Sequence, residues 1–189
     1  MFPPDLPRRG HWLYVTAGLS QPLRPSEVGA VDEPSGYGYE FALAVSSPED
    51  WCLDLLQQLM TYARLATKRV APGHRLPLAF FEEEDGTRFP WIKIVNDSDR
   101  PPVSDVRAMI LWPYKGSPDS LQTQTGTFNI LAATLITGEE WEAAKQTSSA
   151  HIMLLLERIG IGQLADPYRP SATSDPRWSN EWEEIRKRN

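Results

Sequence analysis

The segment SGYGYEFALAV, from Ser35 to Val45, joins two glycines and two tyrosines to a run of apolar residues. A glycine-rich loop that binds phosphate and a buried strand that contains glycine both fit this composition. A phosphate loop needs backbone N–H groups aimed at the anion, usually with a lysine and a helix directly behind the glycines. Here Glu40 and an apolar run follow the glycines, and the first lysine of the chain is Lys68. The segment is therefore predicted to be a strand and not part of a nucleotide site.

Alternation within this segment predicts a strand with two unlike faces, because successive side chains of a strand point to opposite sides of the sheet. One face carries large side chains and the other almost only small ones: Tyr37, Tyr39, Phe41, Leu43 and Val45 against Gly38, Glu40, Ala42, Ala44 and Ser46. A face of small residues lets a helix or another backbone approach closely. Glu40 lies on this face, where an ionised carboxylate needs donors such as an arginine or backbone N–H groups. Pairing within the fold is therefore favoured over catalysis.

The residues after this strand predict an amphipathic helix. Ser47 has the character of an N-cap, Pro48 suits the first helical position, and an acid follows at Asp50. Apolar residues then recur at helical spacing until Pro72-Gly73 ends the pattern. Cys52 lies near the start of the helix, where packing is its favoured role. A thiol near a helix N-terminus can also have a lowered pKa, so reactivity stays open.

The rest of the chain is predicted to contain further strands and helices. Asp85-Gly86 is a favoured tight-turn pair and predicts a hairpin over residues 78–95. Thr137-Gly138-Glu139-Glu140 has the pattern of a capping signature and predicts a helix that ends near Lys145. Other expected elements are strands over 106–113 and 126–137 and helices over 150–160 and 178–188. The later part of the strand over 126–137 is expected to be buried on both faces. This order predicts an α+β fold with a mixed or mostly antiparallel central sheet and packed helices.

Length and composition restrict the class of protein. A chain of 189 residues fits one domain over 1–189, with a core expected over about 11–165 and a C-terminal tail or helix over 166–189. The net charge of −6 disfavours a nucleic-acid partner and an anionic membrane surface. A single cysteine excludes an internal disulfide and a cysteine zinc cluster. No apolar run is long enough to span a membrane, and the proline-containing N-terminus does not resemble a secretory signal, so we expect a cytoplasmic protein.

Residue patterns that would declare a reaction are not found. The acidic run Glu82–Asp85 could bind a hard cation, although a solvated hairpin tip is the favoured interpretation because the spacing of an EF-hand is missing. The histidines His11, His74 and His151 are scattered and form no zinc-binding motif. We therefore expect no catalytic residues, no cofactor and no metal.

Several segments, taken in order and with their spacing, resemble the N-terminal domain of the Suppressor of fused family. The two most specific are the strand that begins at Ser35 and the strand after Gln122 that leads into Glu139-Glu140. The matching segments are His11–Ser20, Ser35–Val45, Trp51–Ala63, Ala71–Leu76, Leu121–Ala144 and Leu154–Ser171. The resemblance implies an α+β domain that binds protein and is not an enzyme. Animal members hold Gli-type transcription factors by clamping a peptide as an added strand between two domains, a mode in which main-chain bonds provide affinity.

This chain departs from the animal members in two respects. It ends where the second domain of the family would begin, so a two-domain clamp is not expected. Its segment Leu111–Ser120 has Trp112, Tyr114 and Lys115 where animal members carry acidic residues that matter for Gli peptides, so Gli-type binding should not be transferred. These three residues are the candidate protein-binding residues, because aromatic residues often dominate binding energy; core packing of the two aromatic rings is an equal alternative.

The resemblance also implies a partner class. Short single-domain members look like the bacterial branch of the family, which has been associated with toxin gene clusters. The leading hypothesis is a bacterial binding protein, in particular an immunity protein that neutralises a toxin, and the net charge of −6 suits a basic partner. The alternatives are a regulatory scaffold that binds a short peptide of an endogenous protein and an enzyme that uses Glu40, Glu82–Asp85 or His74.

Overall fold

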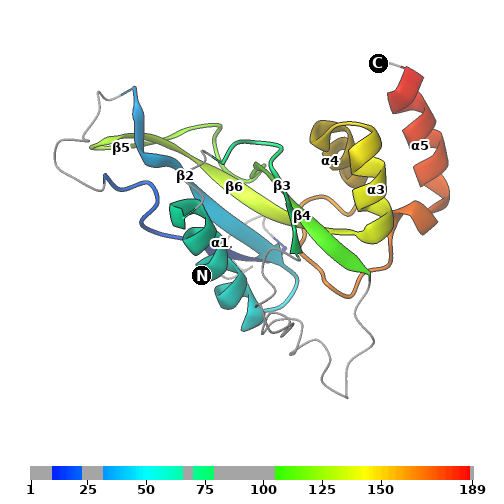
Figure 1. Ribbon diagram of the computed structural model, residues 1–189, viewed down its shortest axis with the longest axis horizontal. Helices are drawn as coiled ribbons and strands as arrows, with labels where there is room; N and C mark the ends of the chain where they lie inside the picture. The colour runs from blue at the N-terminus through cyan, green and yellow to red at the C-terminus, as the bar shows by residue number, and fades with distance from the viewer. Residues whose placement is uncertain (1–9, 23–31, 66–69, 79–104, 188–189) are drawn as a thin grey trace. The chain divides into compact units, whose positions relative to one another are not determined.

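The computed structural model describes residues 10–22, 32–65, 70–78 and 105–187. Its elements in chain order are β1 (Trp12–Val15), β2 (Pro34–Val45), α1 (Trp51–Leu65), β3 (Arg75–Pro77), β4 (Val106–Pro113), β5 (Leu121–Thr123), β6 (Gly126–Thr137), α3 (Gly138–Gln146), α4 (Ser149–Arg158), the 3-10 turn η3 (Ala172–Ser174) and α5 (Pro176–Lys187). They are drawn in Figure 1. No helix within the described ranges combines the length and the apolar composition needed to cross a membrane.

The strands form one mixed sheet of six strands in the order β1-β2-β6-β4-β3, with β5 paired to β6. Strands β2 and β6 run parallel, whereas β1 with β2, β3 with β4 and β5 with β6 are antiparallel. The predicted α+β class with a mixed sheet is therefore confirmed. The chain divides into two compact units, residues 1–72 with 112–133 and residues 73–111 with 134–189. Each unit is described by itself below.

In the first unit, β2 is the strand predicted from the glycine-rich segment. Its register against β6 shifts between Pro34 and Tyr39, and Gly36 and Gly38 in that stretch have φ values of 58° and 79°. A Cβ atom on Gly36 would lie 2.4 Å from the carbonyl oxygen of Gln21. The two glycines therefore allow a bulge that packs against another backbone, while every residue from Tyr39 to the end of β2 is buried. The segment is a strand, as predicted.

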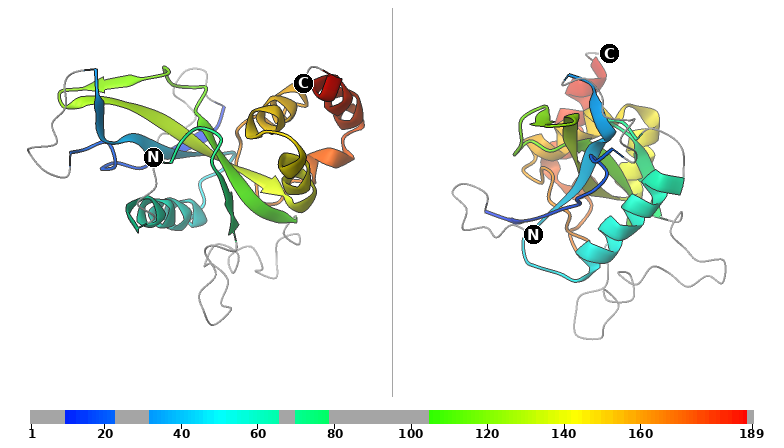
Figure 2. Two further views of the ribbon diagram at one scale, coloured as in Figure 1. Left: turned by 45° about the horizontal axis from the view of Figure 1, so that its top comes forward. Right: turned by 90° about the vertical axis from the view of Figure 1, so that its left-hand side faces the viewer.

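Helix α1 packs against β1 and β2 in this unit (Figure 2), but it begins at Trp51 and not at Pro48 as the sequence predicted. The hydroxyl of Ser47 bonds the Glu49 carboxylate at 3.2 Å, while the backbone N–H of Glu49 donates to the hydroxyl of Tyr14 at 3.2 Å. The contact with β1 thus uses the amide that a longer helix would have placed in its first turn. The helix buries the face formed by Trp51, Cys52, Leu55, Leu56, Leu59 and Ala63.

Cys52 is buried completely in this face. Burial raises the pKa of its thiol to about 12, because the interior disfavours the thiolate. The packing role is confirmed, and the lowered pKa that would have made the thiol reactive is not found.

The second unit contains β3 and the helices α3, α4 and α5. Helix α4 packs against α3 and against α5, its neighbours in the sequence (Figure 1). The strands predicted over 106–113 and 126–137 have those bounds in the structure, and residues 131–137 of β6 are all buried. The short strand β5 was not predicted, because its three residues are too few to show a pattern. The predicted hairpin at Asp85-Gly86 and the acidic run Glu82–Asp85 lie outside the described residues.

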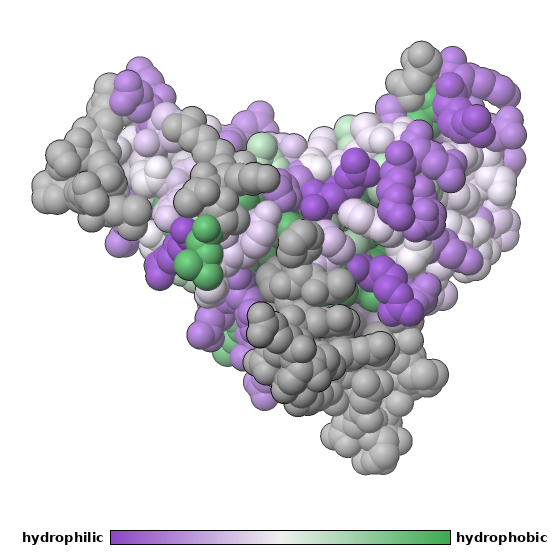
Figure 3. All heavy atoms as spheres, viewed as in Figure 1, coloured by the Kyte–Doolittle hydropathy of each residue, from purple (hydrophilic) through white to green (hydrophobic). Residues whose placement is uncertain are grey.

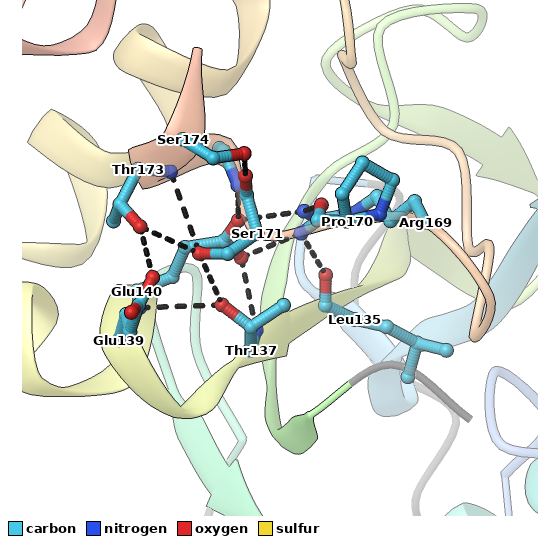
Figure 4. Close-up of polar contacts among 10 residues, drawn as sticks. Leu135, Thr137, Glu139, Glu140, Arg169, Pro170, Ser171, Thr173 and Ser174 are labelled. Atoms are coloured by element: carbon cyan, nitrogen blue, oxygen red, sulfur yellow. Dashed lines mark hydrogen bonds and ion pairs between the residues drawn. The ribbon is translucent and has the colours of Figure 1, made fainter. Parts of the chain in front are cut away.

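A buried ion pair joins α3 to the chain after residue 166 (Figure 4). Glu140 is 0% exposed and Arg169 is 7% exposed. The Arg169 guanidinium donates to both carboxylate oxygens of Glu140, at 2.6 and 2.5 Å, and also to the carbonyl of Leu135 at 2.9 Å. The carboxylate accepts further bonds from the backbone N–H groups of Thr137 and Ala172, at 2.9 and 2.7 Å. The predicted capping box of Thr137 and Glu140 is therefore present, and its acid also holds the C-terminal segment.

Candidate protein-interaction site

The carboxylate of Glu40 is the first structural component of the site. Glu40 is 2% exposed on β2. One carboxylate oxygen accepts from the Thr16 hydroxyl at 2.5 Å. The other accepts from the backbone N–H groups of Gly18 and Ser20, at 2.9 and 2.8 Å, and from the Ser20 hydroxyl at 2.7 Å. The expected pairing within the fold is confirmed, and it uses backbone N–H groups and hydroxyls with no arginine among the described partners.

This arrangement fixes the loop that follows β1. Thr16 continues the antiparallel pairing beyond β1, because its N–H donates to the Phe41 carbonyl at 2.9 Å and its hydroxyl accepts from the Phe41 N–H at 2.9 Å. Three residues further on, the Leu19 carbonyl accepts from the N–H of Tyr37 in the bulge at 2.7 Å. The loop over 16–20 is thus bound to β2 at both ends and by the Glu40 carboxylate between them.

The predicted interaction residues lie at and just after the end of β4. Trp112 is half-buried and Lys115 is exposed, whereas Tyr114 is buried with 6% exposure. The Tyr114 hydroxyl bonds His11 Nε2 at 2.9 Å, and the two rings meet edge to face. The N–H of Tyr114 donates to the Ile130 carbonyl on β6 at 2.9 Å. The Tyr114 side chain is therefore held in place, while Trp112 and Lys115 face partly or fully outward.

A cavity of about 310 Å³ lies beside this segment within the first unit. Its walls come from four parts of the chain: β1 with its following loop, Glu40 of β2, the turn over 114–117, and β6. The apolar part of the wall is formed by Leu13, Val15, Phe128 and Ile130. The turn contributes Tyr114. We call this space the edge cavity. The sequence predicted Tyr114 as a site residue but not the two β6 residues, Phe128 and Ile130. The available signal was their position on either side of Asn129, which places both side chains on the same face of the strand.

The three histidines, all within the described ranges, make separate hydrogen bonds. No group of three or more histidine, cysteine or acidic residues there could hold a metal ion. His11 bonds Tyr114, and His151 Nδ1 bonds the Thr147 hydroxyl at 2.6 Å in the second unit. The His74 carbonyl accepts from the N–H of Leu111. The side chains of His11 and His151 therefore form hydrogen bonds within the fold.

The mixed six-stranded sheet and the four helices of the described ranges define the class as an α+β domain. The chain belongs to the Suppressor of fused family, because the family model described as Suppressor of fused protein (SUFU) matches residues 1–170. The resemblance identified from the sequence is therefore confirmed.

Solved structures share the fold. Drosophila Suppressor of Fused superposes with a TM-score of 0.68 and 17% identity, over 94% of this chain and 42% of that chain. A chain of a Sufu–Fu complex gives a TM-score of 0.65 and 18% identity, over 91% and 74% of the two chains. A SUFU homologue from Neisseria gonorrhoeae FA 1090 gives 0.52 and 17%, over 88% and 74%. This chain thus spans less than half the length of the Drosophila protein. No curated protein sequence matches it.

Proposed function

We propose that the chain is a non-enzymatic protein-binding domain and that its contact surface comprises Trp112, Tyr114, Lys115 and the edge cavity. The observation that carries the proposal is the position of the edge cavity beside a strand at the end of the sheet order. Membership of the Suppressor of fused family and the existence of a solved Sufu–Fu complex of a relative support it.

The geometry favours an extended peptide segment of the partner as the bound element. Strand β1 pairs only with β2 among the described strands, and a peptide can add to such an edge through main-chain hydrogen bonds. Leu13 and Val15 share one face of β1 and both line the edge cavity. Alternate side chains of an added strand would therefore reach an apolar wall, with the exposed Lys115 and half-buried Trp112 nearby to give charge and aromatic contact area.

We propose further that the chain is a cytoplasmic bacterial immunity protein whose partner is a toxin. A net charge of −6 accelerates association with a basic protein, and a homologue with the same fold is found in Neisseria gonorrhoeae. An endogenous regulatory partner would use the same peptide-binding surface. An enzyme is the less favoured reading, because the Glu40 carboxylate already accepts four hydrogen bonds and is committed to the fold.

Co-expression with the product of the adjacent gene tests the immunity proposal. We expect the chain to relieve toxicity of that product and to copurify with it, and Trp112→Ala with Lys115→Glu to abolish both effects. Trp182→Ala with Lys187→Glu is the matched control, because Trp182 is also half-buried and Lys187 is also exposed, in the second unit. Equal killing with and without the chain, together with no copurification, would sink the immunity role.

A further inference from the structure

The edge cavity combines an apolar wall with one carboxylate, that of Glu40. Leu13 and Val15 of β1 and Phe128 and Ile130 of β6 form the apolar part of the wall. Glu40 pairs in register with Ile130, so the two side chains lie on the same face of the sheet. A ligand in the cavity would therefore contact apolar side chains along its length and meet a negative charge where β2 contributes to the wall.

The Glu40 carboxylate is stabilised by neutral donors, and its two oxygens are used unequally. Oε1 accepts three hydrogen bonds, from the backbone N–H groups of Gly18 and Ser20 and from the Ser20 hydroxyl. Oε2 accepts one, from the Thr16 hydroxyl. A carboxylate has about four acceptor positions, two on each oxygen. The described residues therefore fill Oε1 and leave one acceptor position on Oε2 open to a ligand.

Two serine hydroxyls in the wall of the cavity provide further acceptors. The Ser20 hydroxyl donates to Glu40 at 2.7 Å, and the Ser117 hydroxyl donates to the Tyr114 carbonyl at 3.1 Å. A hydroxyl that donates its single hydrogen can still accept through its oxygen. Both serines line the cavity, which thus offers acceptor positions to a ligand group that brings several N–H donors.

We propose that the edge cavity binds a lysine side chain of the partner, with its carbon chain on the apolar wall and its ammonium group at Oε2 of Glu40. The proposal rests on the protein-binding function proposed above and names the chemistry that the partner brings to it. Lysine carries a compact charge with three donors on a four-carbon chain, and such a chain packs well along apolar surface. Arginine is less suited, because its planar fork matches two parallel acceptors of a carboxylate, and Oε1 is already filled.

The free edge of β1 can place this lysine. The N–H of Thr16 donates to the Phe41 carbonyl, so the alternation of an antiparallel ladder directs the main-chain groups of Leu13 and Val15 to the edge away from β2. A partner strand that pairs there turns every second side chain to the face of Leu13 and Val15. Because Oε2 lies at the Thr16 hydroxyl, the lysine needs to reach across one strand, a spacing of about 4.8 Å.

The test is an NMR titration of the full chain with N-acetyl-L-lysine N-methylamide, and it needs no partner protein. We expect saturable shifts of the backbone amide signals of Gly18 and Ser20, which donate to Glu40. The expected Kd is on the order of 1 mM, from the ligand efficiency of small ligands. The norleucine analogue keeps the carbon chain but lacks the charge, so it should bind about tenfold more weakly. The arginine analogue should bind about threefold more weakly.

The variant Glu40→Gln should bind the lysine probe about tenfold more weakly and the norleucine probe as the wild type does, because only the charge is removed. Glu142→Gln is the matched control, since it changes an exposed glutamate of the second unit and should bind every probe as the wild type does. The comparison of the probes on the wild type needs no variant, so it decides the question even if Glu40→Gln fails to fold.

Four results would overturn the proposal. Equal affinity for the lysine and norleucine probes would show that the cavity takes an apolar side chain. Tighter binding of the arginine analogue or of N-acetyl-L-glutamate N-methylamide would assign it to another charge. Wild-type affinity in a folded Glu40→Gln variant, or no saturable shift at Gly18 and Ser20, would place the lysine elsewhere. Shifts of these amides that depend on protein concentration without any probe would assign the cavity to a second copy of the chain. None of these results decides whether a partner binds the domain, which the co-expression experiment measures separately.

Discussion

Two glutamates, Glu40 in the first unit and Glu140 in the second, are both buried but are stabilised in different ways. Glu140 is 0% exposed and is paired with Arg169, which brings a countercharge into the interior. Glu40 is 2% exposed and is surrounded by two backbone N–H groups and two hydroxyls, all neutral. A buried charge without a counterion is stabilised only by its hydrogen-bond donors, so its stability depends on how those donors are positioned. The Glu40 carboxylate therefore depends on the geometry of one loop, whereas the Glu140 carboxylate has a buried countercharge in addition to two backbone donors.

The largest expected effect comes from Arg169→Met. Removing one partner of a buried ion pair leaves an uncompensated charge, which costs about 3–5 kcal/mol of unfolding free energy. Urea unfolding should show a lower midpoint with an unchanged slope. Arg158→Met is the control, because Arg158 forms a partly exposed pair with Glu181 whose loss should leave the midpoint nearly unchanged.

The double variant Glu140→Leu with Arg169→Met separates pairing from packing. Replacing both partners of a buried pair by apolar residues is often neutral or stabilising, so the double variant should recover most of the stability that Arg169→Met loses. A double variant as unstable as the single one would show that the guanidinium acts through its bond to Leu135 and not through the carboxylate.

For Glu40→Gln, a smaller loss of about 2–3 kcal/mol is expected. The substitution removes the charge and turns an N–H₂ group toward existing donors, so charge-assisted hydrogen bonds are lost without a change of size. The control Glu142→Gln affects an exposed residue and should be nearly neutral. If the two variants unfold at the same urea concentration, the four hydrogen bonds to Glu40 contribute nothing measurable.

Gly36→Ala tests whether the loop that supplies the donors of Glu40 is held by the bulge. Its added Cβ would lie 2.4 and 2.5 Å from the carbonyl oxygens of Gln21 and Leu19. Gly162→Ala is a matched control, because φ is 62° there, close to the 58° of Gly36, and nothing lies within 4 Å of its Cβ. The control should lose about 1–2 kcal/mol from backbone strain alone. Gly36→Ala should lose about 1–2 kcal/mol more from the clash. Equal losses in Gly36→Ala and Gly162→Ala would mean that the loop moves to accommodate the added Cβ.

The smallest expected effect is that of Thr137→Val. It removes the N-cap hydroxyl of α3 at nearly constant volume, and loss of a cap typically costs about 1 kcal/mol. The measurement is the midpoint of thermal unfolding. Thr61→Val, which removes an exposed hydroxyl within α1, serves as the control and should leave the midpoint nearly unchanged.

The contrast between the two glutamates also explains how far the sequence could predict the structure. The capping box around Glu140 is local, so four consecutive residues were enough to predict it. Arg169 lies 29 residues away, and no local pattern pairs it with Glu140. Glu40 was recognised as a buried carboxylate from strand alternation, but its donors come from a loop 20 to 24 residues earlier.

The candidate site shows the same limit. Residues Trp112 to Lys115 could be proposed from a family resemblance, whereas their environment depends on contacts distant in sequence, such as that of Tyr114 with His11. Composition alone also gave no sign of the edge cavity. On the face drawn in Figure 3, hydrophobic residues form small groups among hydrophilic ones, and the exposed large apolar side chains within the described ranges, Leu53, Leu65 and Leu154, belong to α1 and α4.

The most direct test of the proposed function is the affinity of the purified chain for the product of its neighbouring gene, measured by calorimetry for the wild type, Trp112→Ala and Lys115→Glu. The account predicts a tight complex for the wild type and at least a tenfold loss for Trp112→Ala with unchanged unfolding stability, because aromatic contact residues that dominate binding cost more than about 1.4 kcal/mol when truncated. Lys115→Glu should mainly change the association rate, because charges at the rim of an interface act on diffusional encounter. Wild-type affinity in both variants would contradict the account, because the partner would then bind elsewhere on the domain.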